Sequence, residues 1–322
     1  MVGIREIAKQ AGVSISTVSN VLAGRSNVGK ETMNRVLEIC KEAGYYPNAS
    51  ARNLKAGNTK TILFNFSDFE RMYYLEVIQG INDRLQKSGY DVLVCTGGSL
   101  ERFLRSRFTD GAIILDAYVP DELLLDTAQA DLPIVTLDRD LRSPYMRCVM
   151  PDNYGSMAEL TEALIQKGHS RFAFVEGVMH AKDNLERKRG VMDVLAAHGT
   201  PLPPEMCFNG KYTNDGGYAA GVMIAELGEL PDVVVCANDG MAMGVFRALT
   251  ERGLRVPQDV AITGYDGDKM TRSYASFLTT IVSPLYMIGY NGAGTILHML
   301  NPEIPAPGDL PKPEILWSAT TP

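Results

Sequence analysis

The sequence has little of several features that mark particular classes of protein. It has one tryptophan, four histidines and five cysteines in 322 residues, and the cysteines lie far apart with no Cys-x-x-Cys pair. We therefore expect reduced thiols rather than a disulfide framework or a metal site. No apolar run is long enough to cross a bilayer, and charged residues interrupt the N-terminus where a signal peptide would be apolar. These absences favour a cytoplasmic protein with no membrane partner.

Signals of catalysis are also missing. Gly97 and Gly98 stand side by side, but without the spacing of a dinucleotide-binding fingerprint or a P-loop. The four histidines form no readable grouping with a serine or cysteine nucleophile. We therefore expect no enzyme, and hence no catalytic residue, no cofactor and no metal.

Charge is unevenly distributed along the chain. The formal net charge is −7, yet residues 1–60 carry nine Lys or Arg against four acids, about +5, so the remainder carries −12. A basic N-terminal region on an acidic body is the asymmetry expected when only that region meets nucleic-acid phosphates. The acidic body would keep the rest of the surface away from DNA.

The first residues have the pattern of two short helices joined by a turn. Apolar residues recur at helical spacing from Ile4 to Ala11, and Gly12 would end that helix with left-handed backbone angles. Ser14 is suited to cap a second helix that begins near Ile15. Two helices joined by such a turn predict a helix-turn-helix, although two helices of a larger core would show the same pattern.

The residues that follow make the DNA-binding interpretation much stronger. A third amphipathic helix is expected over about 29–43, ended by Gly44. The whole stretch of about 57 residues resembles the lactose/galactose-repressor family of bacterial transcription regulators. The matching positions are Ala8, Gly12, Val13, Ser14, Ser16, Thr17, Val18, Ser19, Val21, Leu22, Glu31, Thr32, Val36, Gly44, Tyr45, Pro47, Asn48, Ala51, Arg52 and Leu54.

The resemblance implies how this region reads DNA. The second helix would lie in the major groove, with Ser16, Thr17 and Asn20 at the base edges. The amide of Asn20 suits a bidentate contact to adenine; the alternative is a solvated helix position. Arg25 and Lys30 are expected on phosphates, where contacts position the protein without specifying sequence.

Residues 48–56 resemble the hinge helix of the family. Such a short helix is marginal alone, so it would fold only when two copies pair in the minor groove. Ala51 and Arg52 would belong to that paired hinge, with Leu54 as an apolar wedge between base pairs. Ser50 stands where the family usually has an aliphatic residue, and an ordinary linker is the alternative.

From residue 61 onward, strands and helices alternate. The strands are rich in Val and Ile, which is typical of parallel strands covered on both faces. We expect strands at about 61–66, 90–95, 111–115, 133–137, 172–175, 233–236, 260–263 and 279–282. We expect helices at about 73–88, 100–107, 154–167, 184–198, 215–227 and 241–251. Two such series predict two open α/β subdomains with a ligand cleft at the carboxyl ends of their strands.

The resemblance continues through this region and implies the fold of periplasmic sugar-binding proteins. The fold class is then an all-α helix-turn-helix head followed by an α/β core of two doubly wound parallel sheets, between which the chain crosses three times. The expected division is a DNA-binding domain at 1–46 and a hinge at 47–59. The first core subdomain would take 60–152 with 283–303, and the second 153–282 with 304–322.

Matching the family position by position gives a set of candidate effector ligands. They are Tyr73, Tyr74, Asp138, Arg139, Arg187, Tyr212, Asn238, Asp239 and Asp266. Carboxylates, amides, guanidinium forks and tyrosine rings suit a sugar or sugar derivative, and the arginines would also suit a phosphate or carboxylate. The alternatives are that the aspartates cap helices and that Arg187 pairs with a core acid. Residues 67–72 and Ser283 depart from the family pattern, which leaves a non-sugar effector open.

Together these features predict a sequence-specific regulator of transcription, specifically a repressor. It would bind a palindromic operator in double-stranded DNA as a homodimer or a larger assembly, under control of a small effector. The alternative is a ligand-binding or transport module without regulatory DNA binding, against which residues 1–57 argue.

Overall fold

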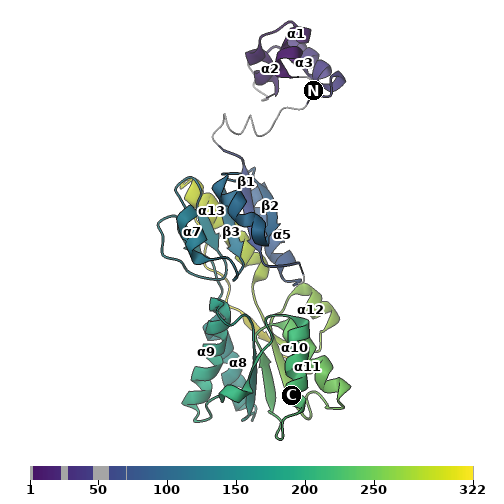
Figure 1. The fold of residues 1–322 in the computed structure, drawn as a ribbon, viewed down its shortest axis with the longest axis vertical. Helices are drawn as coiled ribbons and strands as arrows, with labels where there is room; N and C mark the ends of the chain where they lie inside the picture. Colours follow the sequence, from purple (N-terminus) through teal and green to yellow (C-terminus); the bar gives the residue numbers. More distant parts are fainter. Residues whose placement is uncertain (1–2, 23–27, 46–57, 70, 322) are drawn as a thin grey trace. The chain divides into compact units, whose positions relative to one another are not determined.

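The protein is described by a computed structural model for residues 3–22, 28–45, 58–69 and 71–321. The chain divides into two compact units, residues 1–59 and residues 60–322, and each is considered by itself. In its described residues the first unit contains helices and no strand, whereas the second contains two sheets covered by helices (Figure 1).

The described residues of the first unit form three helices, whose ends follow from local chemistry. They are α1 (Ile4–Ala11), α2 (Ile15–Leu22) and α3 (Lys30–Glu42). Gly12 ends α1 with φ +63°, and the amide of Val13 donates to the carbonyl of Ala8 over 3.0 Å, which closes the last turn. The hydroxyl of Ser14 accepts from the amide of Thr17 over 3.0 Å and so caps α2. The expected helix-turn-helix is confirmed.

A small apolar core holds these helices together. Ile7, Val18 and Val36 are fully buried, one from each helix. Ala8 is also buried, which lets α1 and α2 approach closely. With Val18 and Val21 inward, helical spacing turns Ser16 and Asn20 to the opposite, outer side of α2.

The first sheet of the second unit contains five parallel strands in the order β2-β1-β3-β4-β5. The strands are β1 (Thr61–Phe66), β2 (Asp91–Thr96), β3 (Gly111–Leu115), β4 (Ile134–Thr136) and β5 (Met146–Cys148). The helices are α5 (Tyr74–Gln86), α6 (Leu100–Arg105) after the short turn η1 (Gly97–Ser99), α7 (Asp121–Thr127) and α13 (Leu285–Leu300).

Alternation along β1 decides which helices cover which face of this sheet. Ile62, Phe64 and Phe66 pack against α5 and α13, whereas Leu63 packs against α6 and α7. Two glycines allow α5 and α13 to touch: a Cβ on Gly80 would lie 2.0 Å from a carbonyl oxygen of α13, and one on Gly289 equally close to a carbonyl oxygen of α5. The sheet is therefore buried on both sides.

The second sheet has six strands in the order β11-β10-β9-β8-β6-β7, all parallel except β11. The strands are β6 (Phe172–Glu176), β7 (Cys207–Asn209), β8 (Val233–Cys236), β9 (Ala261–Asp266), β10 (Thr279–Val282) and β11 (Glu314–Leu316). The helices are α8 (Asn153–Gln166), α9 (Lys182–Ala197), α10 (Asn214–Ala225), α11 (Asp239–Glu251) and α12 (Lys269–Tyr274), with the short turn η2 (Pro204–Met206) before β7. The pair α8 and α9 lies on one face and the pair α10 and α11 on the other (Figure 1).

The chain passes three times between the two sheets. It leaves the first sheet after β5 to enter α8, returns after β10 to form α13, and goes back to form β11. The expected fold class, a helical head followed by two parallel-dominated sheets, is confirmed. None of the helices in the described part of the chain is long and apolar enough to cross a membrane.

Candidate effector cleft and DNA-reading helix

The carboxyl ends of the strands in both sheets face a common cleft. Its space is divided into three cavities of about 40, 260 and 20 Å³. Arg71 and Tyr73, which follow β1, line all three cavities, and so does Tyr212, which follows β7. Side chains from both sheets therefore meet in one small volume, as expected for α/β sheets that bind ligands beyond their carboxyl ends.

Arg187 is the buried cation of the second sheet's side of the cleft. Helix α9 presents it, its Nε donates to Oδ1 of Asn153 over 2.9 Å, and its Nη1 donates to the carbonyl of Ala237 over 2.6 Å. The guanidinium carbon lies 3.6 Å from the ring centroid of Tyr265, and Asp266 Oδ1 is 3.7 Å from Nη1. These partners fix the guanidinium plane, which leaves its outer edge to serve a ligand.

Asp266 is the most perturbed acid that faces this cation. It is the last residue of β9, and its φ of +107° is a strained value for a non-glycine residue. The pKa of its carboxyl is raised to about 7, mainly because burial disfavours the charged form. The positive charges of Arg187 and Arg71 oppose this rise, and the like charges of Asp268 and Asp183 add to it. Strain and a shifted pKa at one residue indicate a functional position rather than a simple helix cap.

Tyr212 fills the centre of the cleft from a left-handed backbone position, with φ +62°. Its ring lies directly on Gly177, where a Cβ would be 2.2 Å from the ring. Asn238 holds the same segment: its Nδ2 donates to the carbonyl of Tyr212 over 3.2 Å, and its Oδ1 accepts from the amide of Met241 to cap α11. The amide of Asn238 thus lines the cleft and also fixes Tyr212.

Asp239 borders the cavity of about 260 Å³ and also supports its cleft neighbour Asp266. Its carboxylate accepts from the hydroxyl of Thr280 over 2.5 Å and from the amide of Gly267 over 2.8 Å. Burial, together with the like charge of Asp266, raises its pKa well above the usual range. Asp239 therefore fixes the turn that carries Asp266.

Asp138 and Arg139 form an ion pair at the end of β4. Arg139 donates to Asp138, to Asp121 over 2.8 Å and to the carbonyl of Val119 over 2.8 Å, so its donors are engaged within the first sheet's side. The pKa of Asp138 is raised to about 6 because burial disfavours the charged form, and the positive charge of Arg139 opposes only part of this rise. Asp138 lines one of the three cavities, whereas Arg139 lines a separate opening of about 480 Å³ beside it.

The two tyrosines at the start of α5 differ in how they border the cleft. Tyr73 lines all three cavities, while Tyr74 is buried against Phe66, with ring centroids 4.7 Å apart, and borders only the smallest cavity. The two tyrosine rings lie 4.3 Å apart. Tyr73 thus presents a surface to a ligand, and Tyr74 supports it.

The cleft residues that were not predicted from the sequence include Asp183, Asn153 and Arg71. Asp183 and Asn153 lie next to Arg187, and neither follows a predicted strand directly. Arg71 comes from the segment 67–72, whose departure from the family pattern was the only sign that something different stood there. Its entry into the cleft depends on the course of that loop.

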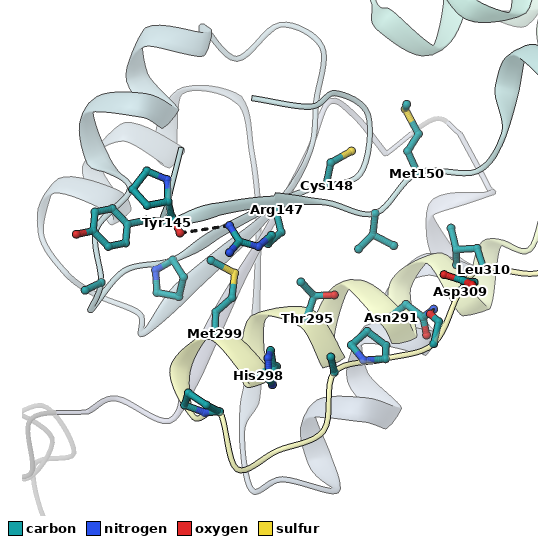
Figure 2. Close-up of a pocket in the computed structure, with 18 of the residues that line it drawn as sticks. Tyr145, Arg147, Cys148, Met150, Asn291, Thr295, His298, Met299, Asp309 and Leu310 are labelled. Atoms are coloured by element: carbon teal, nitrogen blue, oxygen red, sulfur yellow. Dashed lines mark hydrogen bonds between the residues drawn. The ribbon is translucent and has the colours of Figure 1, made fainter. Parts of the chain in front are cut away.

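A larger groove lies elsewhere, between α13 and the edge strand β5 (Figure 2). It has a volume of about 740 Å³, and Arg147, Asn291 and His298 are among its polar side chains. These groups bond to the protein's own backbone: Asn291 Nδ2 donates to the carbonyl of Gly308, His298 Nδ1 lies 2.6 Å from the carbonyl of Ile304, and Arg147 donates to neighbouring carbonyls. The cleft, where polar groups converge from both sheets, is the better ligand site.

In the first unit, the predicted DNA-reading residues lie on one helix. Ser16 is exposed, and Thr17 and Asn20 are half-buried on α2, while Lys30 is exposed at the start of α3. The hydroxyl of Ser14 lies 2.7 Å from that of Ser16, which orders the start of the helix. Arg25, Ala51, Arg52 and Leu54, and with them the expected hinge, lie outside the described residues.

Two family models match this chain. Residues 3–48 match the model of bacterial regulatory proteins of the lacI family, and residues 161–321 match a periplasmic binding protein-like domain. The HTH-type transcriptional repressor PurR of Vibrio atlanticus (strain LGP32) is 30% identical over 309 residues, which cover 93% of this chain and 92% of that protein. This chain belongs to the lacI family of bacterial regulatory proteins. It is therefore a DNA-binding regulator of transcription and not an enzyme.

Other members of the lacI family align over similar lengths. The HTH-type transcriptional regulator AscG of Escherichia coli (strain K12) is 31% identical over 311 residues, 94% of this chain and 93% of that protein. Among solved structures, a CelR-cellobiose complex is 27% identical, with a TM-score of 0.73 over 99% of this chain and all of that chain. A lac repressor dimer bound to operator and an anti-inducer shares the fold at a TM-score of 0.84, with 23% identity.

Proposed function

We propose that this lacI-family member is a cytoplasmic repressor that binds a palindromic operator as a dimer. Its affinity for the operator rises or falls when a small polyhydroxyl effector enters the cleft. In this proposal residues 1–46 read DNA and 47–59 form the hinge. Residues 60–152 with 283–303, and 153–282 with 304–322, form the two lobes around the effector.

The observation that carries the proposal is the convergence of hydrogen-bonding groups from both sheets on the same cavities. In one cavity Arg187, Asp266 and Asn238 face Tyr73. In a smaller one Asp138 faces Asp183 and Tyr212. Such groups suit vicinal hydroxyls, and the rings of Tyr73 and Tyr212 suit the apolar faces of a small ring compound. A ligand bound to both sides would favour one relative closure of the lobes.

Two contacts across the cleft would respond to that closure. The amide of Lys269, at the start of α12, donates to Oε1 of Glu76 on α5 over 2.6 Å. On the other side, His180 Nε2 lies 3.2 Å from the carbonyl of Ala117. Because α12 follows the turn that carries Asp266, movement of that turn changes the contact with Glu76.

On the DNA side, we propose that Ser16, Thr17 and Asn20 contact base edges and that Lys30 contacts phosphate, as does Arg25. The positions of Ser16 and Asn20 on the outer side of α2, and of Lys30 at the start of α3, support this assignment. The hinge residues Ala51, Arg52 and Leu54 would enter the minor groove between the two half-sites; for these the support is the sequence resemblance alone.

A gel-shift experiment tests the proposal. Full-length protein is titrated against DNA from around its own gene at several salt concentrations. We expect a shift that falls steeply with salt, and loss of sequence preference in Asn20→Ala while Lys30→Ala weakens binding to all sequences equally. Glu38→Ala, on the outer side of α3, serves as the control. Binding without any sequence preference in the wild-type protein would refute regulation through an operator.

A further inference from the structure

Arg71 lies inside the cleft among three aromatic rings. Its guanidinium carbon is 4.9 Å from the ring centroid of Tyr74, 5.8 Å from that of Tyr73 and 5.8 Å from that of Tyr212. All three distances fall within the ~6 Å range over which a cation is attracted to an aromatic face. Two of these rings come from the first sheet's side of the cleft and one from the second.

The same side chain divides the space that an effector needs. Arg71, Tyr73 and Tyr212 separate cavities of about 40, 260 and 20 Å³. Ligand pockets usually hold ~300–1,000 Å³, so a ligand that fills the cleft from one lobe to the other must displace one of the three side chains. Tyr212 is packed against Gly177, and the ring of Tyr73 is packed at a tilt against that of Tyr74.

Arg71 is the least firmly held of the three. Its Nη2 and Nε donate to a single oxygen of Asp68, over 2.9 and 3.2 Å. The side chain of Asp68 is 37% exposed, so this partner stands at the open edge of the cavity of about 260 Å³. A swing of Arg71 toward solvent could keep this ion pair, whereas a swing of either tyrosine would break its packing.

Displacing Arg71 would remove a positive charge from a cleft rich in carboxylates. Asp183 and Asp266 line the same cavity as Arg71, and both face Arg187 at 3.7–4.0 Å. Nε and Nη1 of Arg187 already donate to Asn153 and Ala237, so its guanidinium cannot turn to neutralise both acids fully. A cation in place of Arg71 would restore the balance; a neutral ligand would not, and an anion would add repulsion.

We propose that the cleft contains a cation site, formed by the rings of Tyr73, Tyr74 and Tyr212 beside Asp183 and Asp266, which Arg71 fills when no effector is bound. The effector is then an amine-bearing polyhydroxyl compound, and its ammonium group takes the place of the guanidinium. The identity of the effector rests on the regulatory function proposed above, whereas the cation site rests on the geometry alone.

Chemical rescue tests the cation site without knowledge of the effector. Arg71→Ala removes the guanidinium, and ethylguanidinium supplies the missing atoms from Cγ outward. We expect the variant to melt at a lower temperature than wild type, and ethylguanidinium at a few millimolar to raise it again by several degrees. Neutral ethylurea, of nearly the same shape, should have no such effect.

Arg84→Ala is the matched control, because Arg84 also lies over a tyrosine ring, 5.8 Å from that of Tyr290, but outside the cleft. Ethylguanidinium should not stabilise this variant. Should Arg71→Ala fail to fold, Arg71→Met takes its place with guanidinium itself as the added cation, because the methionine side chain reaches about as far as Nε of arginine. An equal response of both sites, or none at Arg71, would overturn the cation site.

A charge series then tests the effector class. Glucosamine, glucose and gluconate share one carbon skeleton and differ in charge, and their binding is measured by calorimetry. We expect glucosamine to bind at least about tenfold more tightly than glucose, gluconate not to bind, and Arg71→Met to bind glucosamine more tightly than wild type. Preference for glucose or gluconate, weaker binding to the variant, or no response to any of the three would overturn the assignment.

These outcomes are separable from the function itself. The rescue experiment measures the melting temperature and the charge series measures ligand binding, and neither measurement depends on operator DNA. If wild-type protein fails to recognise any operator, the regulatory proposal falls while the rescue experiment still reports on the cation site.

Discussion

Replacing Asp266 by asparagine should change how the stability of the protein depends on pH. The carboxyl is buried and its pKa lies near 7 in the folded protein, against about 3.9 in an unfolded chain. The folded state therefore retains a proton that the unfolded state loses. This stabilises the fold at low pH, and the stabilisation disappears as pH rises from about 4 to about 7.

The magnitude follows from the difference between the two pKa values. About three pKa units correspond to roughly 4 kcal/mol over the full window. Between about pH 5.5 and about pH 8, where measurement is practical, roughly 2 kcal/mol should be lost. The asparagine side chain cannot ionise. The unfolding free energy of Asp266→Asn should therefore fall by roughly 2 kcal/mol less than that of wild type over this interval.

Urea unfolding at one fixed protein concentration measures this difference, because a dimer's stability depends on concentration. The matched control is Asp259→Asn, since Asp259 is paired with Arg255 and its pKa is lowered to about 2, below the interval measured. That variant should keep the wild-type slope. Parallel profiles for wild type and Asp266→Asn would show that the carboxyl is ionised throughout and would refute the reasoning.

Three further predictions concern other parts of the chain. Ser14→Ala removes the cap of α2 and should destabilise the DNA-binding unit by about 1 kcal/mol in thermal unfolding followed by circular dichroism; Ser14→Asp, another good cap, should restore it. Gly177→Ala puts a methyl group 2.2 Å from the ring of Tyr212 and should abolish effector binding in calorimetry, whereas Gly228→Ala, with open space around it, should not. Leu54→Ala should weaken operator binding at least about tenfold in gel shifts while the melting temperature of the core stays unchanged; unchanged operator binding would exclude a wedge role for this residue.

The parts of the fold that carry strong local signals could be predicted from the sequence. Gly12 and Ser14 place the turn of the helix-turn-helix, and the apolar run at Thr61–Phe66 gives β1 with the bounds that the structure shows. One long helix, α13 with sixteen residues, was not predicted. The other elements without a prediction are short, and among them β5, β7 and β11 have three residues each, α12 has six and α7 has seven. Such segments are too short for a periodicity to develop, and their pairing partners are distant in sequence.

The candidate site divides in the same way. Asn238 and Asp266 come at the ends of apolar strands, where α/β folds place ligand groups, so sequence position alone brings them to the cleft. The distinct roles of neighbouring residues could not be predicted. Asp239 turns to Thr280 and Gly267, and Arg71 enters the cleft, because tertiary packing sets both directions.

The most direct test of this account is the operator affinity of the full-length protein with and without the ligand that most raises its melting temperature. Fluorescence anisotropy measures both dissociation constants. We expect the ligand to change the operator affinity by ~5–150-fold, which corresponds to a coupling of ~1–3 kcal/mol, and Arg187→Met to remove that change while leaving ligand-free DNA binding intact. Identical operator affinities with and without a bound ligand would contradict the claim that the cleft controls DNA binding.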